Sequence, residues 1–123
     1  MKKYLVIGNP IDHSLSPKLQ NYWIKLNKIE AIYGKLQAHD EDLKELCNNI
    51  KNGQIDGLNV TVPFKKKIIP FLDELDPKAK QIGAVNTIQF SKEGLIGFNT
   101  DAYGFQKSLE PYLKPHHAQA LIF

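Results

Sequence analysis

The regular exchange between two hydrophobic patterns constrains the fold of this chain more than any other feature of its sequence. Short apolar runs, typical of buried strands, alternate with segments in which apolar residues recur at helical spacing. Such alternation predicts an α/β fold, an open three-layer sandwich with a mainly parallel mixed sheet and helices on both faces. We expect strands over residues 4–7, 30–38, 56–62, 83–91 and 94–99, a short helix over 64–69, and helices that begin at Ser16, Asp40 and Asp101.

Local signals predict how the helices begin and which side each one buries. Ser16 followed by Pro17 is typical of a helix with serine at the N-cap and proline at the first helical position. Asp40 is the predicted cap of the second helix. We expect the apolar positions 19, 22, 23 and 26 of the first helix to face the core, and likewise Ala102, Phe105 and Leu109 of the last helix.

Chain length and the C-terminal pattern bear on the domain organisation. A chain of 123 residues suffices for one domain, which we place at residues 1–113. Residues 111–117 are typical of a linker, and residues 118–123 (AQALIF) match the opening of another buried strand. We therefore expect the chain to be the N-terminal part of a longer protein.

The charge of the chain narrows the kind of partner. All 16 basic residues are lysines, against 13 acidic residues, for a formal net charge of +3. This mild excess favours a small anionic molecule, because nucleic-acid binding usually relies on clustered arginine or on aromatic residues between the charges. The run of three lysines at 65–67 argues only weakly for nucleic acid, so we predict no nucleic-acid partner.

The single cysteine, Cys47, excludes an internal disulfide and any zinc site built from several cysteines. Its place on the apolar side of a predicted helix favours a buried free thiol, with a reactive thiol as the alternative. The four histidines are too scattered to predict a metal site. No apolar run approaches the ~20 residues of a membrane helix, and the first run is too short for a signal peptide, so we expect a cytoplasmic protein without membrane contact.

Four segments place small polar residues near the ends of predicted strands, where open parallel sheets usually bind ligands. In the first, the hydroxyls of Ser14 and Ser16 lie at a helix start and offer a seat for a carboxylate, with simple capping as the alternative. In the second, alternation puts Asn59 and Thr61 on one face of a strand, where a bound polyol would satisfy them. Lys65 follows that strand, either as a ligand contact or as a solvated lysine.

The other two segments hold one candidate each. Asn86, after Gly83-Ala84-Val85, offers a donor and an acceptor, unless it merely begins a strand. Asp101 is either a helix cap or a carboxylate that accepts a hydrogen bond from a substrate hydroxyl or a lysine. No glycine-rich nucleotide loop, HExxH or CxxC pattern occurs in the sequence. Each segment is therefore ambiguous alone, and their combination is more informative.

The chain resembles the N-terminal substrate-binding domain of the shikimate dehydrogenase family in four segments that occur in this order: G-N-P-I-D-H-S-L-S-P, N-V-T-V-P-F-K, G-A-V-N-T and G-F-N-T-D. The resemblance covers essentially all 123 residues. It implies an enzyme that reversibly reduces 3-dehydroshikimate to shikimate with NADPH in the pathway to aromatic amino acids. It also implies that residues 118–123 are the first strand of a dinucleotide-binding domain that holds NADP.

The resemblance implies a role for each candidate residue. Lys65 and Asp101 would form the catalytic pair beside the carbonyl that is reduced, with Lys65 as proton donor and charge stabiliser or mainly as a binding residue. The other substrate contacts would come from Ser14 and Ser16 at the substrate carboxylate, and from Asn59, Thr61 and Asn86, together with Asp101, at the ring hydroxyls.

Two alternative functions remain open: a quinate/shikimate dehydrogenase that uses NAD, and a ligand-binding module without catalysis.

Overall fold

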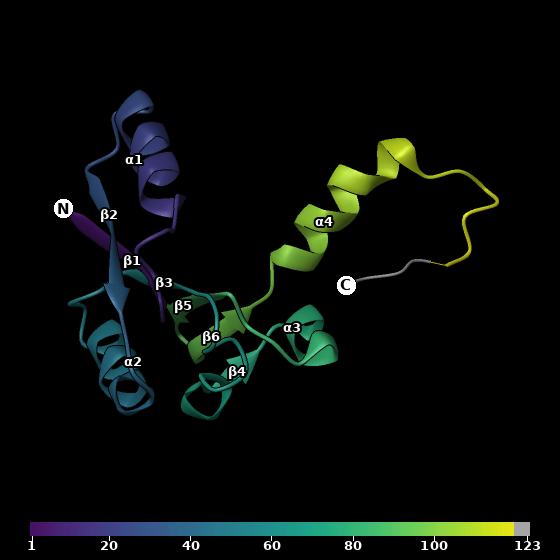
Figure 1. The fold of residues 1–123 in the computed structure, drawn as a ribbon. Helices are drawn as coiled ribbons and strands as arrows, with labels where there is room; N and C mark the ends of the chain where they lie inside the picture. The colour runs from purple at the N-terminus through teal and green to yellow at the C-terminus, as the bar shows by residue number, and fades with distance from the viewer. Residues whose placement is uncertain (120–123) are drawn as a thin grey trace.

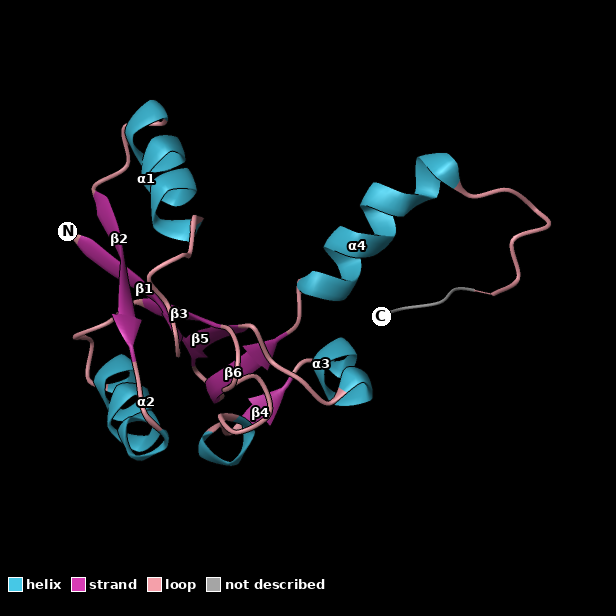
Figure 2. Cartoon of the chain, in the orientation of Figure 1, coloured by secondary structure: helices cyan, strands magenta, loops and turns pink. Residues whose placement is uncertain are grey.

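The computed structural model describes residues 1–119, which form a six-stranded sheet with helices on both faces (Figures 1 and 2). The strand order in the sheet is β2-β1-β3-β5-β6-β4. Short 3-10 turns cover Asp40–Asp42, Ile69–Phe71 and Glu110–Tyr112. The elements are β1 (Lys2–Gly8), α1 (Ser16–Leu26), β2 (Ala31–Gln37), α2 (Leu43–Lys51), β3 (Gly57–Val60), β4 (Glu74–Leu75), α3 (Pro77–Ile82), β5 (Thr87–Ser91), β6 (Gly94–Phe98) and α4 (Asp101–Leu109).

The sheet is mixed, with parallel pairing in its first half. β1 lies between β2 and β3 and is parallel to both, whereas β5 is antiparallel to β3 and to β6. The short strand β4 pairs in parallel with β6 at the far edge. The predicted α/β class and the predicted hairpin at residues 83–99 are thus confirmed, with Gly94 supplying the left-handed backbone (φ 99°) after the hairpin turn.

Alternation along the central strands divides the core into two layers. Ile7, Leu58 and Val60 face α2 and α3 and belong to the larger buried cluster. Val6 faces the other way, where it packs with Tyr33 and Ile24 beneath α1. Helix α2 follows its predicted periodicity, because its buried residues are Leu43, Leu46, Cys47 and Ile50.

Helix α1 presents a different side to the sheet from the one its apolar residues predict. The predicted inward stripe is exposed, whereas Ile24 packs against the smaller cluster and Asn21 bonds both backbone groups of Tyr33. These two hydrogen bonds, of 2.8 and 3.0 Å, satisfy polar groups of β2 and so set the rotation of α1 about its axis. The expectation was wrong for these side chains: Leu19, Tyr22, Trp23 and Leu26.

Helix α4 also departs from its prediction. It extends away from the sheet (Figure 1), and Ala102, Phe105 and Leu109 are exposed instead of pointing inward. The expectation was wrong because, within residues 1–119, α4 has no extensive contact with any strand or other α-helix that would bury an apolar side.

The helix starts are shifted from their predicted caps. Ser16 is the first residue of α1, and the residue at the N-cap is Leu15, whose side chain makes no capping bond. The hydroxyl of Ser14 instead accepts a hydrogen bond from the backbone N–H of Ser16 at 3.3 Å. Asp40 likewise begins a 3-10 turn, with His39 at the N-cap position, where the backbone N–H of His39 donates to the Asp42 carboxylate at 2.8 Å.

The elements between positions 61 and 86 also differ from the prediction. The predicted helix over 64–69 is a series of turns, and the third helix is α3, which begins after Asp76 and ends at Gly83. Asp76 accepts a hydrogen bond from the backbone N–H of Lys78, and Gly83 adopts the left-handed conformation at the C-terminal end. The strand predicted over 83–91 therefore begins only at Thr87.

Most of the strand predicted over residues 118–123 lies outside the described residues, so this expectation stays a prediction. None of the helices within residues 1–119 is long and apolar enough to cross a membrane.

Candidate functional site

Tight packing at the ends of β1 and β3 brings two of the four polar segments together. Gly8 ends β1, and a Cβ atom added there would lie 2.6 Å from the methyl carbon of Thr61. The backbone N–H of Asn9 donates to the carbonyl of Val62 at 3.0 Å, and that of Thr61 donates to the carbonyl of Ile7 at 2.9 Å. The loop that leads to Ser14 and the segment after β3 therefore leave the sheet side by side.

The burial of the preceding residue and a backbone hydrogen bond fix the backbone position of Lys65. Phe64 is buried in the larger core cluster, and the carbonyl of Lys65 accepts a hydrogen bond from Val85 at 2.8 Å. The Lys65 ammonium lies 2.6 Å from the Asp101 carboxylate, with side-chain exposures of 32% and 53%. Both side chains of this charge-assisted pair are partly exposed, so a ligand can contact both groups.

Asn86 connects β5 with the start of α4. Its side-chain nitrogen donates to the Thr100 hydroxyl at 2.8 Å. Its oxygen accepts from the Thr100 backbone at 2.9 Å and from the Thr87 hydroxyl at 3.0 Å. These bonds place Asp101, the next residue after Thr100, beside the segment that carries Lys65.

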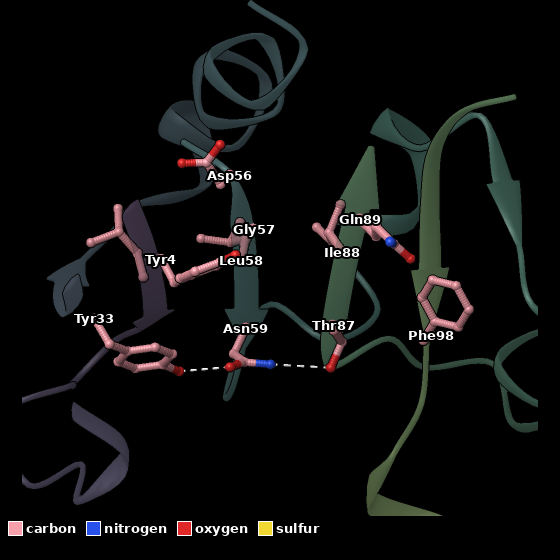
Figure 3. A pocket seen from close by; sticks show the side chains of 11 residues that line it. Tyr4, Tyr33, Asp56, Gly57, Leu58, Asn59, Thr87, Ile88, Gln89 and Phe98 are labelled. Atoms are coloured by element: carbon pink, nitrogen blue, oxygen red, sulfur yellow. Dashed lines mark hydrogen bonds between the residues drawn. The ribbon is translucent and has the colours of Figure 1, made fainter. Parts of the chain in front are cut away.

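Asn59 joins this network from β3. Its side-chain nitrogen donates to the Asn86 carbonyl at 3.2 Å and to the Thr87 hydroxyl at 3.1 Å, and its oxygen accepts from the Tyr33 hydroxyl at 2.6 Å. Figure 3 shows the contacts from Tyr33 to Asn59 and from Asn59 to Thr87, which link residues of β2, β3 and β5. Asn59 and Tyr33 both line a cavity of about 290 Å³ on the α1 side of the sheet. Burial raises the pKa of Tyr33 to about 12, so its hydroxyl stays protonated.

The structure thus connects four candidates and leaves three less constrained. Hydrogen bonds and the ion pair link Asn59, Asn86, Lys65 and Asp101 through the residues around them. Within residues 1–119, no hydrogen bond or ion pair joins the side chain of Ser14, Ser16 or Thr61 to that network, so their convergence on one ligand stays a prediction.

Three residues of the network were missed by sequence reasoning. Thr87 and Thr100 lie inside two of the four segments, so a closer look at the hydroxyls in those segments would have found them. Tyr33 lies outside all four segments, in a strand without any local sign of function. Only the alignment of β2, β1 and β3 in the sheet brings its hydroxyl to Asn59.

The described residues do not provide a metal or dinucleotide site of familiar type. Residues 1–119 contain no group of three or more His, Cys, Asp or Glu side chains placed to hold a metal ion. After β1, the Thr61 methyl group occupies the space in front of Gly8. The backbone there is not open to a pyrophosphate as it is in a dinucleotide-binding turn.

Polar side chains at the carboxyl ends of parallel strands define an α/β ligand-binding domain. Comparison with known proteins shows which family within this class the chain belongs to. The family model described as the shikimate dehydrogenase substrate binding domain matches residues 6–88, and the chain belongs to this family.

Individual relatives agree with the family model. The chain is 56% identical over 109 residues to a Pelagibacter ubique protein named shikimate dehydrogenase (NADP(+)), covering 89% of the chain and 41% of the relative. A shikimate dehydrogenase structure from Aquifex aeolicus matches with a TM-score of 0.84 and 44% sequence identity. The match covers 92% of this chain and 42% of the Aquifex aeolicus chain. A Thermus thermophilus shikimate 5-dehydrogenase in complex with shikimate matches with a TM-score of 0.83 and 34% identity, over 90% and 42% of the two chains. The chain therefore spans less than half the length of these relatives.

Proposed function

We propose that this chain is the substrate-binding part of an NADP-dependent shikimate dehydrogenase, which reversibly reduces 3-dehydroshikimate to shikimate. The observation that carries the proposal is the 2.6 Å ion pair between Lys65 and Asp101, on segments joined by the Asn86 network. Membership of the family supports it, as does the shikimate complex of the Thermus thermophilus relative. A cytoplasmic location is part of the proposal and suits the buried free thiol of Cys47.

Lys65 and Asp101 are the proposed catalytic pair. In the direction of reduction, the Lys65 ammonium donates a proton to the carbonyl oxygen and stabilises the negative charge that develops there. Asp101 accepts a hydrogen bond from Lys65 and thereby aims the ammonium group. Its second carboxylate oxygen is a suitable acceptor for a substrate hydroxyl.

The remaining proposed contacts divide by chemistry. The hydroxyl of Ser14 accepts from the Ser16 backbone, so its own hydrogen is directed elsewhere and is suited to a carboxylate, as is the hydroxyl of Ser16. The side-chain oxygen of Asn86 accepts from two protein donors. One of its two N–H groups donates to the Thr100 hydroxyl, which leaves the other for a ring hydroxyl. Thr61 and Asn59 complete the proposed wall for the ring hydroxyls.

In this proposal NADPH would supply the hydride, and the turn after β1 does not fit the pyrophosphate of such a cofactor. The backbone after β1 is closed by the contact between Gly8 and Thr61. We therefore derive no step of this chain through the cofactor.

A domain exchange tests the activity. We would replace the matching part of the Pelagibacter ubique relative with residues 1–109 of this chain and measure NADP-dependent oxidation of shikimate. We expect the hybrid protein to turn over shikimate and to prefer it to quinate. Replacement of Lys65 by methionine should lower kcat by about 10²–10⁴-fold, with a smaller change in KM, because a proton donor acts mainly in the transition state.

Lys66→Met is the matched control. Lys66 is exposed, and its side chain forms no ion pair or hydrogen bond with any other residue in the range 1–119. Its replacement removes the same charge one position away and should leave kcat within about twofold, as is usual for a surface change. A Lys65→Met protein with normal kcat and raised KM would make Lys65 a binding residue only. A hybrid that binds shikimate and never oxidises it would favour a ligand-binding module.

A further inference from the structure

We propose that Tyr33 is a positioning residue, which holds the side-chain amide of Asn59 so that its oxygen faces a hydroxyl of the ligand. The inference rests on the proposed function, because it takes the ligand to be a small hydroxylated acid. It concerns a residue that lies outside all four polar segments and that reaches the site from β2.

The hydrogen-bond inventory of Asn59 determines what it can offer. Its nitrogen carries two hydrogens, and these are directed to the Asn86 carbonyl and the Thr87 hydroxyl. Its oxygen has two acceptor positions, and the Tyr33 hydroxyl occupies one of them. Among residues 1–119, one acceptor position of the Asn59 oxygen is therefore left for a ligand, and the nitrogen has no hydrogen to spare.

Tyr33 is built into the fold firmly enough to impose this orientation. Its side chain is 6% exposed and packs with Val6 and Ile11. Asn21 of α1 holds its backbone from both sides, through the N–H and the carbonyl. The ring therefore has little freedom, and the 2.6 Å contact with Asn59 is fixed from the tyrosine side.

The two ends of the amide are controlled by different partners. The Asn86 carbonyl can only accept, so it requires the nitrogen of Asn59. The Tyr33 hydroxyl donates to the half-buried side-chain oxygen of Asn59, so one acceptor position of that oxygen is satisfied. Without that donor, we expect the amide to sample other orientations and to accept less well from a ligand.

The test uses Tyr33→Phe in the 123-residue chain, which keeps the ring and removes only the hydroxyl. By calorimetric titration with shikimate, we expect affinity to fall by about 2–10-fold, the range of one net hydrogen bond. In an Asn59→Ala background the same replacement should change affinity less than about twofold, because the group through which Tyr33 acts is gone. Equal losses in both backgrounds would overturn the proposal in favour of a general structural role.

Tyr4→Phe provides a matched control. Tyr4 lies on the neighbouring strand, lines the same cavity and packs on the same cluster. Its hydroxyl makes no hydrogen bond with another residue of the described range 1–119. Shikimate affinity should be unchanged in this variant, and a loss as large as that of Tyr33→Phe would contradict the proposal.

A spectroscopic arm separates this inference from the proposed function. The side-chain NH₂ signals of Asn59, followed by NMR without ligand, should shift and exchange faster with solvent in Tyr33→Phe and stay unchanged in Tyr4→Phe. Unchanged Asn59 signals in Tyr33→Phe would overturn the positioning role. If the native chain shows no saturable binding at millimolar shikimate, the proposed function fails for this chain, while these signals still decide the role of Tyr33.

Discussion

Phe64 contributes both to the stability of the domain and to the position of Lys65, the next residue in the chain. It is 1% exposed and lies in the larger core cluster among residues of α2, α3 and the central strands. Its backbone N–H donates to the Thr61 carbonyl, and its carbonyl accepts from Ile68. Truncation of this side chain should therefore loosen both the core and the segment that carries the ammonium group.

The expected effect of Phe64→Ala follows from its burial. A buried phenylalanine removes about 150–250 Å² from water, which at about 25 cal/mol per Å² corresponds to about 4–6 kcal/mol. Alanine retains the Cβ atom, so we expect a loss of about 3–5 kcal/mol, as is usual for such truncations. This is a large part of the about 5–15 kcal/mol that stabilises a domain of ordinary size.

Urea unfolding followed by circular dichroism measures this loss. With a slope of about 2 kcal/mol per molar urea, the midpoint of Phe64→Ala should fall by about 2 M. If that variant is already unfolded, Phe64→Leu should lose less stability than Phe64→Ala, because it leaves a smaller cavity, and should remain measurable.

Phe105 of α4 offers the control, because it is 63% exposed and the same replacement should change stability by less than about 0.5 kcal/mol. Equal shifts for Phe64→Ala and Phe105→Ala would refute the reasoning from burial.

Two other outcomes follow from backbone conformation and from a buried thiol. Gly94→Ala should destabilise the domain by more than about 1 kcal/mol in urea unfolding, because φ of Gly94 is 99° and the new methyl group would collide with Asp73. Gly104→Ala in exposed α4 should instead stabilise the domain by about 0.5–1 kcal/mol. The opposite order of the two midpoints would contradict this. Burial raises the pKa of Cys47 from 9.0 to about 11, so the unfolded chain loses this proton at lower pH than the folded one. The free energy of unfolding should therefore fall between about pH 9 and 11, more steeply in the native protein than in Cys47→Ala, and parallel pH profiles would exclude the effect.

Local signals predicted those elements whose burial follows directly from their own periodicity. Helix α2 buries the side that its spacing predicts, and the hairpin of β5 and β6 turns where Gly94 permits it. The candidate residues Lys65 and Asp101 were also found from their place after strands, and they form an ion pair across 36 positions of the chain.

The side that a helix buries depends on what lies against it, and this is not a local property. The hydrogen bonds of Asn21 to β2 decide which side of α1 faces the sheet, and α4 is exposed because it has no extensive contact with any strand or other α-helix of residues 1–119. The helix α3 was overlooked even though Asp76 and Gly83 mark its ends, since it is short and has little apolar periodicity of its own.

The amino-acid sequence by itself determined the α/β class, the order of most elements and the chemical types of the candidate site. These properties depend on spacing within short segments, which can be recognised without coordinates. The tertiary structure alone decided that Tyr33 meets Asn59 and that Asn86 joins Thr100. Such contacts link residues on different strands and loops, and their distance depends on strand order and register, which no single segment encodes.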